Sequence, residues 1–126
     1  MRQVIKLVAL AAILVSSNAF SGEVNRALFT TSIEDREPVM KVDSVSSSAF
    51  NSISFFTELT DFQGHNITHQ WVFGDKVMFE KTFEVNGARW RIWTSKTFLP
   101  GWNGTWTVNV LDDDRSLLTS RSFDYQ

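Results

Sequence analysis

The chain has 126 residues, enough for one domain, and its formal charge of −2 at pH 7 argues against the clustered basic surface that nucleic-acid binding requires. It contains no cysteine, which excludes disulfides, thiolate zinc sites and a cysteine nucleophile. Without cross-links the fold depends on an apolar core, and 11 phenylalanines and 5 tryptophans provide the side chains for one.

The first 19 residues have the pattern of a secretory signal peptide. Two basic residues, Arg2 and Lys6, precede an apolar run that is too short to span a bilayer, and small residues end the segment at Ala19. The alternative is an uncleaved anchor. Cleavage after Ala19 leaves 107 residues, 20–126, whose 10 basic and 14 acidic side chains give a formal charge of −4. We therefore expect a periplasmic or secreted domain.

Short apolar runs then alternate with turn formers along the chain. Residues 27–33 predict a first strand, after which a charge cluster closed by Pro38 marks an edge or a loop. The apolar residues around Val42 indicate a short edge strand. Residues 50–59 predict a second long strand. Its core-facing side chains are Ile53, Phe55, Thr57 and Leu59.

Residues 67–97 predict three antiparallel strands joined by two tight turns. Apolar residues recur at every second position, and Gly74-Asp75 and Asn86-Gly87 each separate two such runs. Asn-Gly favours the two positive φ angles of a type I′ hairpin. We expect this meander to contribute the following side chains to the core: Trp71, Phe79, Phe83, Val85, Trp90 and Ile92.

Two further strands complete the pattern, at residues 105–111 and 117–125, after the turn formers of residues 100–104. About seven antiparallel strands, with no helix after the signal peptide, predict a single all-β, immunoglobulin-like β-sandwich. Trp71 lies in the third strand, where such sandwiches bury a tryptophan. Trp106 stands where the tyrosine corner is expected, so the corner hydrogen bond must come from an indole N–H or be lost.

The best candidate binding site is a strip of three side chains on one face of the predicted strand near residue 90. Alternation places Arg89, Arg91 and Trp93 together on that face. Two guanidinium groups and an indole suit a carboxylate, a sugar ring or a partner peptide. The alternative is that both arginines form cross-strand ion pairs with Glu80 or Glu84 of the preceding strand.

Trp102 is a second candidate because it lies in a glycine-rich loop instead of a strand. Loop tryptophans anchor ligands in many binding proteins. They also cap the open ends of sandwiches, and the sequence leaves both interpretations open.

The remaining polar motifs favour structural interpretations. His65 and His69 lie four residues apart, which in a strand is about 13 Å, too far to share a metal ion. We expect His69 to be partly buried and bonded to a neighbour; an enzyme using His69 as general base is the alternative. The run from Asp112 to Asp114 lacks the glycine and the spaced glutamate of a calcium loop, and it predicts a solvated turn.

No catalytic set emerges from the sequence. It has no Gly-x-Ser-x-Gly elbow, no phosphate loop and no dinucleotide fingerprint. We expect a protein that is not an enzyme and that uses no cofactor or metal.

Several segments together carry a family resemblance, which runs from about Arg26 to Tyr125. They are RALFTTSIEDREPV, FFTEL, ITHQWVFGDKVMFEKTFEVNGARWRIWTSK, GTWTVNVLDDD and SFDY. The chain resembles the bacterial family Domain of Unknown Function 2914. It departs from that family's Asp-x-Asp-Gly turn, since Arg115 replaces the glycine. The resemblance implies a bacterial envelope domain with no established activity and no defined catalytic residues.

Together these observations predict an exported, non-enzymatic β-sandwich interaction domain of the bacterial envelope. Its ligand- or partner-binding residues are predicted to be Arg89, Arg91, Trp93 and Trp102. The expected partner is an envelope protein or a glycan, with no nucleic acid and no stable membrane span after signal cleavage. The alternative is a carbohydrate-binding module in which exposed tryptophans stack on sugar rings.

Overall fold

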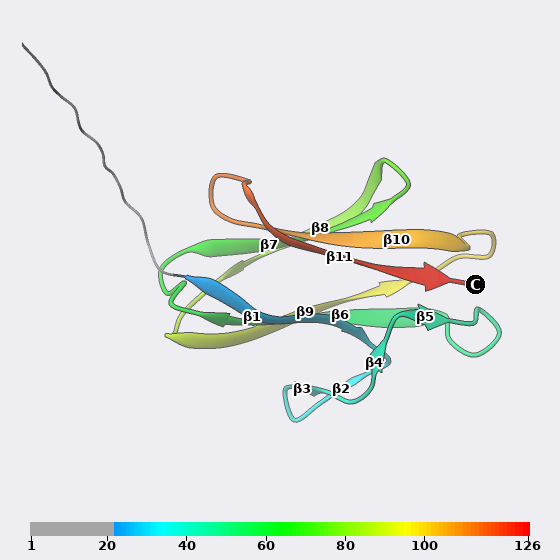
Figure 1. The fold of residues 1–126 in the computed structure, drawn as a ribbon, viewed down its shortest axis with the longest axis horizontal. Coiled ribbons are helices and arrows are strands. Elements are labelled where there is room, and N and C mark those ends of the chain that lie inside the picture. Colours follow the sequence, from blue (N-terminus) through cyan, green and yellow to red (C-terminus); the bar gives the residue numbers. More distant parts are fainter. Residues whose placement is uncertain (1–21) are drawn as a thin grey trace, which may run out of the picture.

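The computed structural model describes residues 22–126. They fold into two facing β-sheets (Figure 1). The predicted signal peptide lies outside the described residues. Sheet 1 has the strand order β4-β1-β6-β9 and sheet 2 the order β5-β11-β10-β7-β8. The predicted all-β sandwich is therefore confirmed. Residues 22–126 contain no helix that could span a membrane.

The strands have the following bounds. Sheet 1 contains β1 (Glu23–Thr30), β4 (Lys41–Val42), β6 (Ser52–Thr60) and β9 (Arg89–Thr97). Sheet 2 contains β5 (Ser44–Val45), β7 (Asn66–Phe73), β8 (Lys76–Glu84), β10 (Gly104–Leu111) and β11 (Leu117–Tyr125). A separate small hairpin consists of β2 (Ile33–Glu34) and β3 (Glu37–Pro38).

The long strand boundaries differ from the prediction at both early strands. β1 begins four residues before residue 27, because Glu23 and Val24 pair with Thr60 and Leu59 of β6. β6 begins at Ser52, two residues after residue 50. Phe50 lies outside the strand, and its carbonyl accepts a hydrogen bond from the Tyr125 hydroxyl.

The core lies between the two sheets and is largely aromatic. The predicted inner face of β6 is confirmed, since its four side chains are fully buried. Phe29 of β1 packs against Phe55 and Phe123, with ring centres 4.9 and 4.6 Å apart. Trp71 and Trp106 are also fully buried, so both sheets contribute large side chains to one core.

β6 is buried on its outer face as well. Phe56 is fully buried there, and Glu58 is almost so. The β2–β3 hairpin lies beyond this face, on the side of sheet 1 away from sheet 2 (Figure 1). Its two-residue turn, Asp35-Arg36, has φ angles of 51° and 65°, the positive values of a type I′ turn. Non-glycine residues adopt these angles rarely, so the turn is a strained feature of the hairpin.

The predicted meander is wrong after β8. β7 and β8 pair as expected, but β9 pairs with β6 in the other sheet. Neither residue of Asn86-Gly87 has a positive φ, so no type I′ turn forms. Instead Val85 is buried, its N–H donates to the His65 carbonyl, and its carbonyl accepts from the Gly64 N–H, both at 2.9 Å. These contacts direct the chain across the end of the sandwich.

This crossing also changes the expected core. Trp71, Val85 and Ile92 are buried as predicted, whereas Phe83 and Trp90 are half-buried. Phe79 is 36% exposed and the prediction that it joins the core is wrong. The reason is that β8 is the edge strand of sheet 2, so within residues 22–126 one flank of the Phe79 side chain has no neighbouring strand beside it.

Candidate functional site

The predicted strip lies on β9, on the face of sheet 1 that points away from the core. In the register with β6, Arg91 is opposite Glu58 and Trp93 is opposite Phe56. Arg89 precedes them on the same face by strand alternation. The side chain of Arg89 is 61% exposed and that of Arg91 is 23% exposed. The predicted grouping of these three side chains is therefore present.

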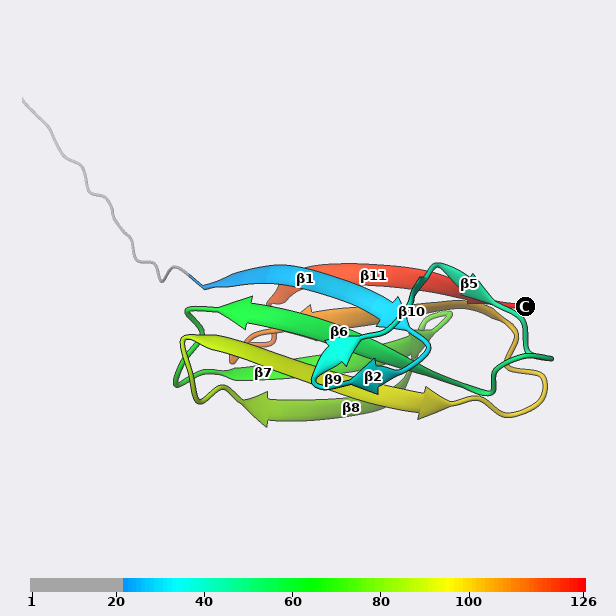
Figure 2. The same ribbon diagram turned by 90° about the horizontal axis from the view of Figure 1, so that it is seen from below.

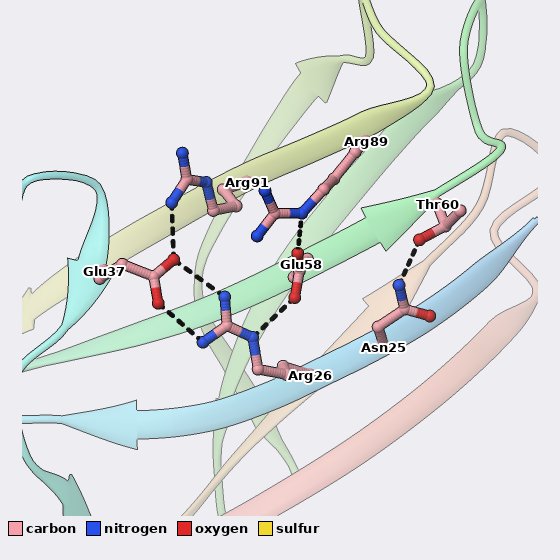
Figure 3. A network of polar contacts seen from close by, with 7 residues as sticks. All are labelled: Asn25, Arg26, Glu37, Glu58, Thr60, Arg89 and Arg91. Carbon is pink, nitrogen blue, oxygen red and sulfur yellow. Dashed lines mark hydrogen bonds and ion pairs between the residues drawn. The ribbon is translucent and has the colours of Figure 1, made fainter.

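Both arginines belong to an ion-pair network that joins four strands, β1, β3, β6 and β9 (Figure 3). At its centre, Arg26 of β1 donates two hydrogen bonds of 2.9 Å to Glu37 of β3 and one of 2.7 Å to Glu58 of β6. Arg91 donates to Glu37 at 2.6 Å, and Arg89 donates to Glu58. The network thus links the hairpin to the outer face of sheet 1.

The ion pairs form with partners other than the predicted ones. Glu80 lies on β8 in sheet 2, where Arg115 donates to it at 2.9 Å. Glu84 lies on the same strand, so neither acid faces Arg89 or Arg91. This part of the prediction is wrong because β8 and β9 belong to different sheets.

The network keeps both of its acids ionised. Hydrogen bonds from Arg26 and then Arg91 lower the pKa of Glu37 to about 2. Burial raises the pKa of Glu58, but hydrogen bonds from Arg26 and Arg89 outweigh burial and bring its pKa below the usual value. Three guanidinium groups face two carboxylates, so the network carries an excess positive charge.

A groove of about 310 Å³ follows the β9 edge beside this network. Its lining residues are Arg36, Phe83, Trp90, Arg91, Ile92 and Trp93. β8 and β9 are the edge strands of their sheets and lie along the same side of the sandwich (Figure 2). The groove therefore combines two cationic side chains with four apolar ones and has no acid in its lining.

Arg36 reaches the groove from the tip of the β2–β3 hairpin. Its guanidinium carbon lies 6.0 Å from the ring centre of Trp93, at the outer limit of a cation–π contact. Within residues 22–126 it has no acidic partner within ion-pair distance, unlike Arg91. The strained turn thus holds an unpaired guanidinium beside the tryptophan.

Trp102 lies apart from this strip, in the loop after β9, and is not part of the groove lining. It is half-buried against Trp106, with ring centres 5.8 Å apart, and the Lys96 ammonium lies 4.9 Å from its ring centre. The Trp102 carbonyl accepts a 2.9 Å hydrogen bond from the Trp106 indole. The corner bond predicted for an indole N–H is therefore present, with the Trp102 carbonyl as its acceptor.

His69 is fully buried, deeper than the partial burial predicted. Its ring nitrogens lie 3.0 Å from the Thr57 hydroxyl and 2.9 Å from the Thr94 hydroxyl, which also accepts from the Trp71 indole. Phe55 packs edge-on against the imidazole. Burial lowers the pKa of His69 to about 3. The imidazole is closed off from solvent and has no acid bonded to it within residues 22–126, so the general-base hypothesis is wrong.

His65 has a separate structural contact. Its Nδ1 lies 2.6 Å from an Asp113 oxygen, and the other Asp113 oxygen accepts from the Asn66 N–H at 2.7 Å. The pair joins the β6–β7 loop to the β10–β11 turn. Nowhere in residues 22–126 do three or more potential metal ligands gather.

Sequence reasoning missed four residues of this surface: Arg26, Arg36, Glu37 and Glu58. They come from β1, the β2–β3 hairpin and β6, and the register of sheet 1 together with the position of the hairpin over that sheet brings them together. The dense charge cluster at residues 34–37 was the available signal, because it precedes Pro38 and so ends near an edge.

Comparisons with known proteins give a family match over part of the chain and the fold. Residues 64–125 match the family model described as a protein of unknown function (DUF2914), which confirms the resemblance over a shorter range than 26–125. The chain is also similar to an immunoglobulin-like protein from Pseudomonas aeruginosa, with 18% identity and a TM-score of 0.60, over 84% of this chain and 97% of that one. This likeness shows the immunoglobulin-like fold. No curated protein matches the chain.

Proposed function

Because this immunoglobulin-like sandwich carries the DUF2914 pattern over residues 64–125 and no enzyme family is indicated, we propose that it is a non-enzymatic interaction domain. It is exported to the bacterial envelope and binds a partner protein there through the β9 strip and groove. The signal-peptide pattern supports export, and the family resemblance supports the envelope.

The observation that carries the proposal is the charge of the groove. Its lining has two arginines and no acid, although the whole chain has a formal charge of −2. Arginine and tryptophan are the side chains most enriched at the energetic centres of protein interfaces. Here Arg91 and Trp93 lie two residues apart on β9, and therefore on the same face of sheet 1.

The ion-pair network prepares Arg91 for binding. Its single bond to Glu37 fixes the side chain and leaves further guanidinium N–H groups for a ligand. A side chain that is already held in place loses less conformational entropy when the partner binds. The network therefore favours binding, and the Arg91–Glu37 hydrogen bond does not have to break when the ligand binds.

The carbohydrate alternative has less support on this surface. The Trp102 ring packs against Trp106 on one side and has the Lys96 ammonium over it. A sugar ring needs an open aromatic face to stack upon. Trp93 remains half-buried beside Arg36.

Site-specific photo-crosslinking in living cells tests the proposal. Benzoylphenylalanine in place of Trp93 should give a discrete protein adduct in the envelope fraction. The same probe in place of Arg121, an exposed residue of β11 in sheet 2, should give none. No adduct from position 93, or equal adducts from both, would contradict the proposal. Sugar binding on a glycan array that is lost in Trp102→Ala would favour the carbohydrate module instead.

A further inference from the structure

Among the strands of residues 22–126, none pairs with one side of the β9 backbone. At the two ends of the β6–β9 pairing, the Phe98 N–H donates to the Asn51 carbonyl and the Asp61 N–H donates to the Ala88 carbonyl, each at 2.8 Å. Bonded residues alternate along an antiparallel pair, so these bonds assign the even-numbered residues of β9 to β6. The N–H and C=O groups of the odd-numbered residues point away from it.

Arg91 and Trp93 are therefore the central residues of a free backbone edge. No strand within residues 22–126 pairs with that side of β9. Unpaired edge groups of this kind are a template for an additional strand. The edge coincides with the groove, whose lining includes both residues.

The neighbouring edge on β8 is protected against strand addition, unlike that of β9. β8 contains a β-bulge, and its Lys81 is opposite the inward-facing His69, with the ammonium 5.5 Å from the Phe83 ring centre. Bulges and inward-pointing lysines are known devices that prevent edge pairing. The inward residues of central β9 are Trp90 and Ile92, with no charge and no proline. Of these two neighbouring edges, β9 is thus the open one.

An added strand would present two different faces to this site. Side chains opposite Arg91 and Trp93 would lie on the outer face, near the unpaired Arg36. The intervening side chains would point toward the groove lined by Phe83 and Trp90. Carboxylates match the first face through paired guanidinium hydrogen bonds, and apolar side chains match the second.

We infer that the partner inserts an extended segment of alternating acidic and apolar residues, which adds to β9 as an antiparallel strand. The inference rests on the proposed function, because it names the partner chemistry of the same site. Backbone hydrogen bonds to Arg91 and Trp93 hold the segment, and the arginines select its acidic side chains.

A second copy of this chain is a poorer occupant. β9 contains no acidic residue, so pairing two copies of β9 would gather Arg89 and Arg91 of both on one face. Like charges across paired strands destabilise the pair.

Model peptides test the inference on the purified protein. An end-blocked octapeptide of alternating Glu and Val should bind and change the tryptophan fluorescence, whereas the Lys-Val counterpart should not. Arg91→Gln should weaken Glu-Val binding roughly tenfold, and Arg121→Gln should leave it unchanged. Equal binding of both peptides, or no binding of the Glu-Val peptide at millimolar concentration, would overturn the inference.

Methylated peptides separate strand addition from simple charge attraction. In an antiparallel strand the N–H groups of the Glu positions face β9, so N-methylation there should abolish binding. N-methylation at the Val positions places the methyl groups away from β9 and should be tolerated. Equal affinity of the two methylated peptides would overturn strand addition.

The two proposals fail in different ways. If position 93 crosslinks a partner in cells but the Glu-Val peptide does not bind, the strand-addition inference is wrong and the interaction function stands. If the peptide binds but no partner crosslinks, the interaction function is wrong. A dimer that forms without peptide and dissociates in Trp93→Pro, which removes an outward N–H, would identify a second copy as the occupant and overturn the inference.

Discussion

The two faces of sheet 1 contribute to polar clusters of opposite character. On the inner face, Thr57 and Thr94 bond to His69 of β7 in sheet 2; this cluster is neutral and buried, and within residues 22–126 its side chains bond to one another and to Trp71. On the outer face, Arg26, Glu58 and Arg91 are charged, with part of the network open to solvent. Consecutive residues of β6, Thr57 and Glu58, belong to the two clusters. The same strand therefore contributes to the buried core on one side and to a partly solvent-exposed charged surface on the other.

The largest expected effect comes from the inner cluster. Thr94→Val keeps the shape of the side chain but removes the partner of both the His69 Nδ1 and the Trp71 indole. Buried polar groups left unbonded cost about 1–3 kcal/mol each, so we expect a loss of about 3 kcal/mol in the free energy of unfolding. Urea denaturation measures it. Thr97→Val, at an exposed position of the same strand, is the control and should change stability by less than about 0.5 kcal/mol. Equal effects of the two would contradict this role.

Acid should weaken the inner cluster before the outer one. His69 has a folded pKa of about 3 and an ordinary value of 6.5, so the unfolded chain binds more protons between these values. Stability is then full above pH 6.5 and falls as the pH is lowered, by about 2 kcal/mol from pH 7.5 to 5. The outer acids, Glu37 and Glu58, have lowered pKa values, so their contributions are lost only below about pH 4.5. A free energy of unfolding that stays constant from pH 7.5 to 5 would contradict the claim that His69 is buried in its neutral form.

Within the outer network, burial should decide which acid stabilises the fold. The side chain of Glu58 is 10% exposed and bonds two arginines, so Glu58→Gln should cost about 1.5 kcal/mol. Glu37 is 42% exposed, and Glu37→Gln should cost less. Urea denaturation in 1 M NaCl should remove most of the Glu37 effect and leave most of the Glu58 effect, because salt screens exposed pairs more strongly. A larger effect at Glu37 would reverse the comparison.

The smallest expected stability change is at the tip of the hairpin. Arg36 has a φ of 65°, which glycine adopts without strain, so Arg36→Gly should change the unfolding free energy by less than about 0.5 kcal/mol. It should nevertheless weaken Glu-Val peptide binding, because the unpaired guanidinium is lost. Asp35→Gly alters the same turn and keeps that guanidinium, and it should bind the peptide normally. Equal peptide affinities for the two variants would show that Arg36 has no part in recognition.

Alternation in the sequence predicted much of the fold. It placed Phe55 and Leu59 of β6 in the core, and Trp71 in the third strand of the sandwich. It failed at Asn86-Gly87, where the hairpin signal is local but the outcome depends on burying Val85 and on its bonds to the β6–β7 loop. A turn motif cannot show whether the next strand stays in the same sheet.

The site was predictable only where it depends on one strand. Alternation sufficed to group Arg91 with Trp93 on β9. Arg26 and Glu37 lie on other elements, and their positions beside Arg91 depend on sheet order and on the hairpin folding over sheet 1. His69 was a candidate catalytic residue in the sequence, yet its threonine and aromatic neighbours make it part of the core.

The most direct test is hydrogen exchange of individual β9 amides, measured by NMR with and without the Glu-Val octapeptide. In the free protein, we expect the N–H groups of Arg91 and Trp93 to exchange fast and those of Ile92 and Thr94 to exchange slowly, because only the latter bond to β6. In the complex, Arg91 and Trp93 should become protected while Ile92 and Thr94 stay as they were. New protection on β8, or none on β9, would contradict binding at the open edge of sheet 1.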